Sequence, residues 1–349
     1  MSLILPISEW PAADQAMWHA LFAEGGPLDG QGPLIHLRKT SRHSLALRYG
    51  QWLKWIATTE PSTLACAPVE RVTCKRLVQW LSSLDRLADM TRLMLVDGVL
   101  RVAMATATAP GRDWSQETKL RKRLKYHAGR GLQSRKHGRI LSSAVLLEAG
   151  LKLVEASASR LNHSLYAATD MRDGAMISLL ALMPIRLRAL AGLELGSSVI
   201  VGQDLILVSI PEDLSKTGQP WEAEVPPQAA AALRAYIDKA RPLLAQRGQG
   251  NISSLWLNRK GNGLRYAGIG PCVARQTLRM TSVRVPPHFF RDAAATALAR
   301  SSPESARLIR GVLGHKGFRT AERHYIHAQT IEAGRDYASL IARLKENRQ

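Results

Sequence analysis

Apolar side chains recur at helical spacing in the first third of the chain. Between residues 41 and 56 they fall about one helical turn apart, and the same spacing returns in a run that begins near Val69. The positions that define the two runs are Leu45, Leu47, Trp52, Leu53, Trp55 and Ile56, and then Leu77, Val78, Trp80 and Leu81. Residues 87–95 and 98–108 are two further predicted helices. No segment in this part of the sequence shows the alternation that is typical of a strand.

The first part of the chain is therefore predicted to be a small all-helical domain, residues 1–126. Asp113 is predicted to cap the last helix of this domain, and that helix is predicted to end at Leu124. Residues 1–32 contain four glycines and several prolines, which indicates a loosely structured lead-in around one short helix.

A stretch rich in glycine and basic residues, 127–139, separates this part from the rest of the chain. It contains no apolar repeat, so we predict an interdomain linker there. An ordinary surface loop is the alternative interpretation.

The remaining residues, 140–349, open with helical patterns and then change in character. Three short segments are predicted strands, with turns at Gly202 and Gly218: residues 199–201, 204–210 and 221–225. A helix is predicted at 227–244, and helices with short connections follow from Ile269 onward. The predicted fold class is mainly α with a small three-stranded antiparallel sheet, that is, α+β.

The charge of the chain is strongly positive. Its 48 lysines and arginines outnumber its 28 acidic residues, which gives a net charge of +20 and a pI near 10.5. Because this excess is spread along the chain, it indicates a polyanionic partner, although a basic protein that is merely soluble is the alternative. The basic linker at 127–139 would suit a strap across phosphate groups.

The cysteines and the apolar segments of the sequence indicate the cellular compartment of the protein. Cys66, Cys74 and Cys272 form no CxxC pair and are odd in number, so neither a disulfide framework nor a zinc site is predicted. The first residues lack the features of a secretory signal. The longest apolar run, 175–185, is too short to span a bilayer. We therefore expect a protein of the reducing cytoplasm with no membrane partner.

Four chemically active side chains gather in residues 287–327. His288 and Arg291 lie three residues apart, on one face of a helix that the preceding proline would start. His315 follows a glycine at the end of a predicted helix, and Tyr325 lies ten residues further on. Taken singly, each has an ordinary interpretation, as a surface pair, a residue beside a helix cap, or a core tyrosine.

Two more cations lie upstream. Arg186 is predicted in the middle of an apolar helix whose buried face is defined by Leu190 and Leu193, which places Arg186 on the inward side. A buried guanidinium needs a paired charge or an anion, because its desolvation is costly. Lys216 is predicted at the tip of the hairpin between the second and third strands, where a lysine is usually just solvated.

The order and spacing of these groups resemble those of the tyrosine recombinases, the phage-integrase-like site-specific recombinases. The resemblance rests on Arg186, Lys216, His288-x-x-Arg291, Leu313-Gly314-His315 and Tyr325. It has specific motifs over 140–349 and is looser over 35–125, near whose end Pro110-Gly-Arg-Asp-Trp114 resembles a segment of the family. It implies a helical core DNA-binding domain at 1–126 and a catalytic domain at 140–349 that form a C-shaped clamp around DNA.

The resemblance also implies roles for the cations and histidines. Arg186 and Arg291 would clamp the non-bridging oxygens of a DNA phosphate. His288 and His315 would add hydrogen bonds or move protons. No ATP, cofactor or metal ion is expected to take part.

Tyr325 is the nucleophile that the resemblance implies, and it would form a 3′-phosphotyrosyl intermediate. Lys216 would then act as the general acid that protonates the leaving 5′-oxygen. Two departures from the family pattern stand out: Ala189 occupies a position where many relatives have Glu, and the step from His315 to Tyr325 is ten residues rather than the commoner nine. The longer step leaves His324 adjacent, but Tyr325 is followed by Ile-His as in the family.

The partners implied are double-stranded DNA with a specific recombination site and further copies of the chain. The expected assembly is a homotetramer in the synapse, docked through a C-terminal helix at 330–344, and a monomer or dimer without DNA. When bound to DNA the protein would be associated with the nucleoid. Candidate DNA-binding residues are Arg42, Lys119, Arg121, Lys122, Arg135 and Lys136.

Three other functions remain open from the sequence. A type IB topoisomerase-like enzyme would use the same nucleophile but relax supercoils without sequence preference. A catalytically lapsed DNA-binding regulator would bind without cleaving. An RNA-binding protein would rest on charge alone, since the sequence has no stacking-aromatic motif to support it.

Overall fold

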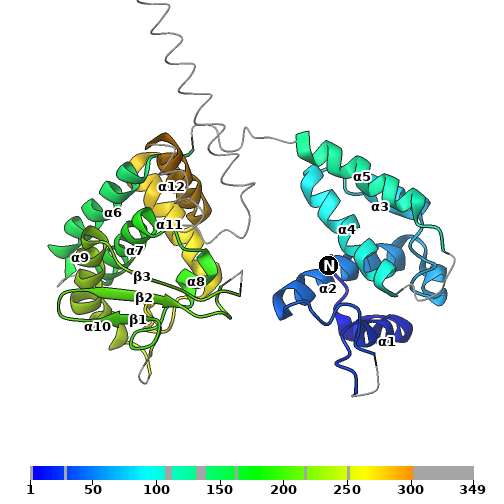
Figure 1. Cartoon of the computed structure of the whole chain (residues 1–349), viewed down its shortest axis with the longest axis horizontal. Helices are drawn as coiled ribbons and strands as arrows, with labels where there is room; N and C mark the ends of the chain where they lie inside the picture. Colours follow the sequence, from blue (N-terminus) through cyan, green and yellow to red (C-terminus); the bar gives the residue numbers. More distant parts are fainter. Residues whose placement is uncertain are drawn as a thin grey trace, which may run out of the picture. The chain divides into compact units, whose positions relative to one another are not determined.

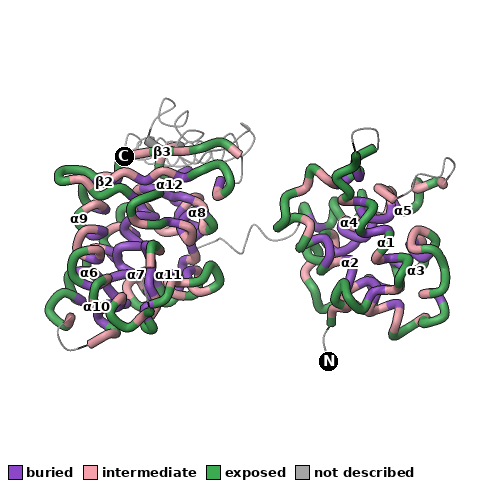
Figure 2. The backbone as a smooth tube through the Cα atoms, turned by 90° about the horizontal axis from the view of Figure 1, so that it is seen from below, coloured by how far each residue is buried: buried purple, intermediate pink, exposed green. Residues whose placement is uncertain are grey.

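The computed structural model of the protein divides into two compact units, Met1–Gln133 and Ser134–Gln349 (Figure 1). The residues that the structure describes are 3–26, 30–106, 112–130, 139–161, 164–215, 218–249 and 252–301. Buried residues gather inside each unit, as Figure 2 shows, so each has its own core. Neither unit contains, within the described residues, a helix long and apolar enough to cross a membrane.

The described part of the first unit is helical, as predicted. Its elements are η1 (Ile7–Glu9), α1 (Ala12–Leu21), α2 (Lys39–Thr59), η2 (Pro61–Ala65), α3 (Cys74–Ser82), α4 (Asp89–Thr106) and α5 (Ser115–Arg130). Trp52, Leu53 and Ile56 of α2 are fully buried, as their spacing predicts, whereas Leu47, predicted on the same face, is exposed. Asp113 accepts a hydrogen bond from the backbone N–H of Ser115 (2.8 Å) and so helps to start α5, which continues beyond the predicted end to Arg130.

Two helix predictions in this unit are wrong in detail. The segments 87–95 and 98–108 form one helix, α4, because Gly98 does not end it. A Cβ added at Gly98 would lie only 2.6 Å from Cδ of Arg48, so the glycine permits α2 and α4 to cross closely. Val78, predicted on the apolar face of α3, is instead exposed.

The one short helix predicted within residues 1–32 is present as α1, but this segment is packed rather than loosely structured. Trp10, Trp18 and Leu21 are buried in the core of the unit. Asp14 of α1 accepts hydrogen bonds from the Tyr49 hydroxyl (2.7 Å) and from the Arg71 guanidinium (2.5 Å), and all three side chains are buried. The glycines and prolines therefore shape the turns around a packed helix.

The second unit combines helices with a small sheet. Its elements are α6 (Ser143–Ala158), α7 (Leu165–Leu182), α8 (Leu187–Ala191), β1 (Val199–Val201), β2 (Ile206–Ile210), β3 (Trp221–Glu224), α9 (Pro227–Ala235), the π-helical turn η5 (Tyr236–Ala240), α10 (Arg241–Ala245), α11 (Tyr266–Thr281) and α12 (Pro287–Ser301). The sheet is antiparallel with the order β1-β2-β3. The predicted α+β class and the three predicted strands are confirmed.

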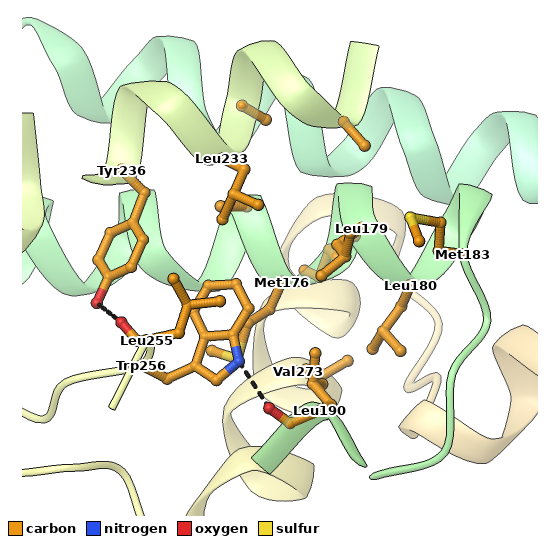
Figure 3. Close-up of a cluster of buried hydrophobic side chains, with 14 of the residues drawn as sticks. Met176, Leu179, Leu180, Met183, Leu190, Leu233, Tyr236, Leu255, Trp256 and Val273 are labelled. Carbon is orange, nitrogen blue, oxygen red and sulfur yellow. Dashed lines mark hydrogen bonds between the residues drawn. The ribbon is translucent and has the colours of Figure 1, made fainter. Parts of the chain in front are cut away.

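Helix α7 forms the centre of this unit. Every residue from Ala167 to Ala181 is buried, as expected of a helix enclosed on all sides. It crosses α6 closely, because a Cβ added at Gly174 would lie 2.8 Å from the carbonyl oxygen of Gly150. Trp256 completes the core in Figure 3. Its indole N–H donates to the carbonyl of Leu190 (2.9 Å), and this hydrogen bond attaches α8 to the core.

Candidate active site

Arg186 lies at the turn between α7 and α8, not inside a helix as predicted. Helix α7 ends at Leu182, and Arg186 is the extended N-cap residue of the short helix α8 (φ −70°, ψ 145°). Pro184 explains the break, since proline has no N–H to donate and disfavours a helical residue before it. The predicted burial of Leu190 and Leu193 is confirmed, and the Arg186 side chain is half-buried.

Arg291 lies on α12 and reaches back to this turn. Its guanidinium donates a hydrogen bond to the carbonyl oxygen of Pro184, with a distance of 2.6 Å between Nη1 and the oxygen. The hydrogen bond joins α12 to the residues just before Arg186. Two predicted site residues that are more than a hundred positions apart in sequence are thus brought to the same place.

The two guanidiniums influence each other electrostatically. Burial, together with the positive charge of Arg186, lowers the pKa of Arg291 to about 10, against a smaller opposing effect of Asp292. Burial also lowers the pKa of Arg186. Both groups still carry a charge at neutral pH, so the fold holds two like charges together in a partly desolvated place. An oxyanion placed between them would relieve this repulsion and accept hydrogen bonds from both.

His288 occupies the first turn of the same helix, α12. Its side chain is exposed, and its ring lies 4.5 Å from the ring of Phe289 in an edge-on contact. The predicted helical spacing of His288 and Arg291 is confirmed, since both lie on α12. The structure therefore brings Arg291 to the turn that carries Arg186, and it places His288 on the same helix as Arg291.

The other predicted catalytic residues lie outside the described residues. These are Lys216, His315 and Tyr325. Two candidate DNA-binding residues of the linker, Arg135 and Lys136, also lie outside the described residues. The two strands that flank Lys216, β2 and β3, are paired as predicted.

The remaining candidate DNA-binding residues lie in the first unit. Lys119 and Lys122 are exposed on α5, and Arg121 lies 3.6 Å from the carboxylate of Asp97. Arg42 donates to two backbone carbonyls and stacks over the ring of Phe22 (4.8 Å), so it also has a structural role that the sequence did not indicate. DNA contact by these residues stays a prediction.

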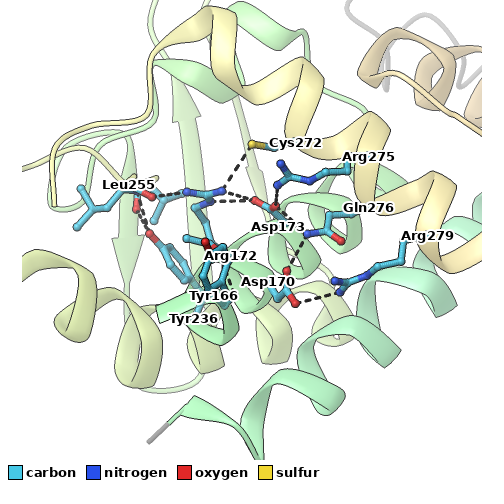
Figure 4. A network of polar contacts seen from close by, with 12 residues as sticks. Tyr166, Asp170, Arg172, Asp173, Tyr236, Leu255, Cys272, Arg275, Gln276 and Arg279 are labelled. Carbon is cyan, nitrogen blue, oxygen red and sulfur yellow. Dashed lines mark hydrogen bonds and ion pairs between the residues drawn. The ribbon is translucent and has the colours of Figure 1, made fainter. Parts of the chain in front are cut away.

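A buried polar network was missed from the sequence. Asp173 of α7 accepts hydrogen bonds from Arg172 (2.6 Å) and from Gln276 of α11 (3.2 Å), as Figure 4 shows. Asp170 accepts from Gln276 (2.8 Å) and pairs with Arg279 (3.0 Å). The network fixes α11, which leads into α12, against the central helix. Three charges within four residues of an otherwise apolar helix were the signal that could have revealed it.

The chain was also compared with known protein families. A profile described as the phage integrase family matches residues 152–332, which is more than half of the chain. The chain belongs to the phage integrase family. This is the tyrosine recombinase family that the motifs resemble, and the matched range includes all six predicted catalytic positions, from Arg186 to Tyr325.

A relative within the family is the tyrosine recombinase XerC of Roseiflexus sp. (strain RS-1), which is 27% identical over 165 residues. That alignment covers 46% of this chain and 50% of XerC, so the chain spans about half the length of this curated relative. The family assignment rests on the profile, and XerC is consistent with it.

Solved structures share the fold. XerH site-specific recombinase, in a pre-cleavage complex with its difH substrate, has a TM-score of 0.58 at 16% identity and is matched over 95% of this chain and 98% of its own. The Tn1549 transposon integrase, bound to transposon right end DNA, has a TM-score of 0.53 at 11% identity over 86% of this chain and 94% of its own. At such identities the likeness concerns the fold of this phage integrase family member.

Proposed function

We propose that this protein is a site-specific DNA recombinase that cuts and rejoins strands through a 3′-phosphotyrosyl intermediate. The observation that carries the proposal is the pair Arg186 and Arg291, held beside each other by the hydrogen bond from Arg291 to the carbonyl of Pro184. Membership in the phage integrase family supports it.

The arginine pair suits the charge that develops in phosphoryl transfer. Attack on a phosphodiester increases the negative charge on its non-bridging oxygens. Two preorganised guanidiniums stabilise that charge more strongly than they stabilise the starting diester, and such groups contribute several kcal/mol to a transition state. His288, on the same helix as Arg291, would donate a hydrogen bond to the same phosphate or relay a proton.

Tyr325 would supply the nucleophile. Its phenolic oxygen forms a bond to phosphorus and passes its proton to His288, which relays it to solvent, while the bond from phosphorus to the 5′-oxygen breaks. Lys216 would give its proton to that leaving oxygen, and His315 would assist through hydrogen bonding. The phosphotyrosyl bond conserves the energy of the broken diester, so a 5′-hydroxyl from a second strand can attack it and release Tyr325 without ATP. The cations of the site supply the positive charge that this chemistry needs.

The two-unit organisation suits a DNA-binding protein. The predicted boundary at 126 falls inside α5, which runs to Arg130, so we assign residues 1–130 as the core DNA-binding domain, 131–139 as the linker and 140–349 as the catalytic domain. The net charge of +20 would provide salt-dependent affinity for phosphates. We further propose a homotetramer in the synapse, in which the C-terminal segment 330–344 docks on a neighbouring protomer.

Trapping on nicked DNA tests the nucleophile. Duplexes selected for binding from a random-sequence pool are nicked near the bound site, so that cleavage releases a short strand and leaves the protein attached. We expect a covalent adduct with the wild-type protein and none with Tyr325→Phe. Tyr166→Phe is the matched control, because Tyr166 is an exposed tyrosine of α7 and its replacement should leave the adduct intact.

Other outcomes separate the competing functions. An adduct that persists in Tyr325→Phe would show that another residue is the nucleophile, and His324→Ala would then be examined. Binding without any adduct would indicate a regulator that has lost catalysis. Relaxation of supercoiled plasmids that lack the selected site, at the same rate as plasmids that contain it, would indicate a topoisomerase-like enzyme.

A further inference from the structure

The turn between α11 and α12 sets the place where the active-site helix begins. Ser282 opens it in a left-handed conformation (φ 58°), the only such non-glycine residue in the part of the chain that the structure describes. Side chains of α11 hold the turn from within: Thr277 Oγ1 accepts from the N–H of Val285 (3.0 Å), and Thr281 Oγ1 accepts from the N–H of Val283 (3.3 Å). Helix α12 follows directly, so the geometry of this turn controls where His288 lies.

Arg139 contacts the same turn from far away in the sequence. Its guanidinium donates to the carbonyl oxygen of Arg284 (3.3 Å) and lies over the ring of Phe289, with 5.2 Å between the guanidinium carbon and the ring centroid. Phe289 is 4% exposed and its ring contacts that of His288 at 4.5 Å. A single guanidinium therefore touches both the turn and the aromatic side chain that packs against the active-site histidine.

Arginine is well suited to this double contact. A planar guanidinium can stack on an aromatic ring while its edge donates to a carbonyl, whereas a lysine ammonium is a point charge that cannot stack in this way. The last residue of the predicted linker 127–139 is thus attached to the start of α12, and the chain that leaves the linker is tied to the active site.

We propose that Arg139 is a positioning residue that holds the α11–α12 turn and Phe289, and through them the place of His288 and Arg291. The inference rests on the proposed function for its catalytic consequence. The positioning role is assigned from the contacts of Arg139 with the carbonyl of Arg284 and the ring of Phe289. A residue that only contacts a DNA phosphate should mainly affect the affinity for DNA. Replacement of Arg139 should instead affect the rate at which bound DNA is cleaved more than the affinity.

The test separates rate from affinity. Single-turnover adduct formation on the nicked duplex is measured at saturating protein, and binding is measured independently by titration. Arg139→Ala should lower the cleavage rate about tenfold, because small displacements of catalytic groups are costly, while changing affinity much less. Arg139→Lys, which keeps the charge, should give an intermediate rate.

Arg259→Ala is the matched control. Arg259 makes the same kind of contact elsewhere in the unit, with its guanidinium carbon 4.6 Å from the ring centroid of Tyr166. Its replacement removes an arginine and one ring contact, so it should leave the cleavage rate near that of the wild-type protein. An equal loss of rate in Arg139→Ala and Arg259→Ala, or a loss of affinity alone in Arg139→Ala, would overturn the positioning role.

Hydrogen–deuterium exchange gives a second readout that does not need activity. Without DNA, Arg139→Ala should speed the exchange of backbone amides in residues 283–292, and Arg259→Ala should not. Unchanged exchange there would refute the proposal even if the rate falls. If the wild-type protein forms no adduct on any selected duplex, the proposed function fails, while exchange still decides whether Arg139 holds the turn.

Discussion

The second unit holds partly or fully buried arginines in two different ways. Arg172 is 3% exposed and bonded to the carboxylate of Asp173 (2.6 Å). Burial alone would lower the pKa of Arg172, but the carboxylate outweighs this effect and the pKa is raised. Arg291 donates instead to a neutral carbonyl and lies near another arginine, and its pKa is lowered to about 10.

The comparison sets an arginine that is paired with a carboxylate against one of the two arginines that we propose to bind a phosphate. Where the fold supplies the anion itself, the guanidinium is stabilised and joins helices together. Beside Arg291 the fold places a second cation, Arg186, and an oxyanion bound there would accept hydrogen bonds from both guanidiniums. Asp173, in the network of Figure 4, raises the pKa of Arg172, whereas burial and Arg186 lower the pKa of Arg291.

The largest expected effect is on stability, in the structural network. Asp173→Asn would leave the charge of Arg172 buried without its carboxylate. We expect a loss of about 3–5 kcal/mol in the free energy of unfolding, measured by urea denaturation followed by circular dichroism. Asp170→Asn is the control, because Asp170 pairs with the more exposed Arg279, and it should lose only about 1 kcal/mol. Equal losses would show that burial does not set the strength of these pairs.

A large effect on activity, with little on stability, is expected at Arg291. Arg291→Leu would remove half of the cation pair, and the rate of adduct formation should fall about 10²–10³-fold. The free energy of unfolding should change by only about 1 kcal/mol, which is the usual contribution of one hydrogen bond such as that to Pro184. A loss of stability as large as that of Asp173→Asn would place Arg291 among the structural arginines.

The smallest expected effect concerns pH. The folded-state pKa of Arg291, about 10, is below that of an unfolded chain, so between these values the unfolded state binds more protons. The contribution of Arg291 to stability is therefore constant below pH 10 and rises with pH above it.

Anion binding should show the opposite trend. As pH rises through 10, Arg291 loses the charge that attracts an oxyanion, so sulfate should bind about tenfold more weakly at pH 11 than at pH 9. The measurement is the sulfate-induced increase in Tm at each pH. Arg291→Leu should lack this pH dependence, and a wild-type response that stays flat would contradict the lowered pKa.

Local patterns were enough to predict the sheet and most helices. The strand segments are bounded by turns at Gly202 and Gly218, and burial alternates along β2 and β3, so these short segments carried a local signal. Gly98 misled because a glycine that ends a helix and one that allows two helices to touch look alike in sequence. The packed lead-in was missed for a similar reason, since the buried partner of Asp14 is Arg71, far along the chain.

The candidate site was predictable in its membership but not in its geometry. Spacing identified His288 and Arg291, and the order of the motifs added Arg186. That Arg186 follows a break at Pro184, and that the carbonyl of Pro184 holds Arg291, depends on contacts between distant segments. The stacking of Arg139 on Phe289 had no signal in local sequence at all.

The buried pair of Asp14 and Arg71 also bears on how the first unit can be studied alone. Glycines near residue 30 make a deletion of the first 32 residues tempting, because they resemble a tail. Such a shortened protein would lose Trp10, Trp18 and the carboxylate that neutralises Arg71. A first unit that is isolated for NMR or crystallisation should therefore start before Trp10, the first buried side chain of its core.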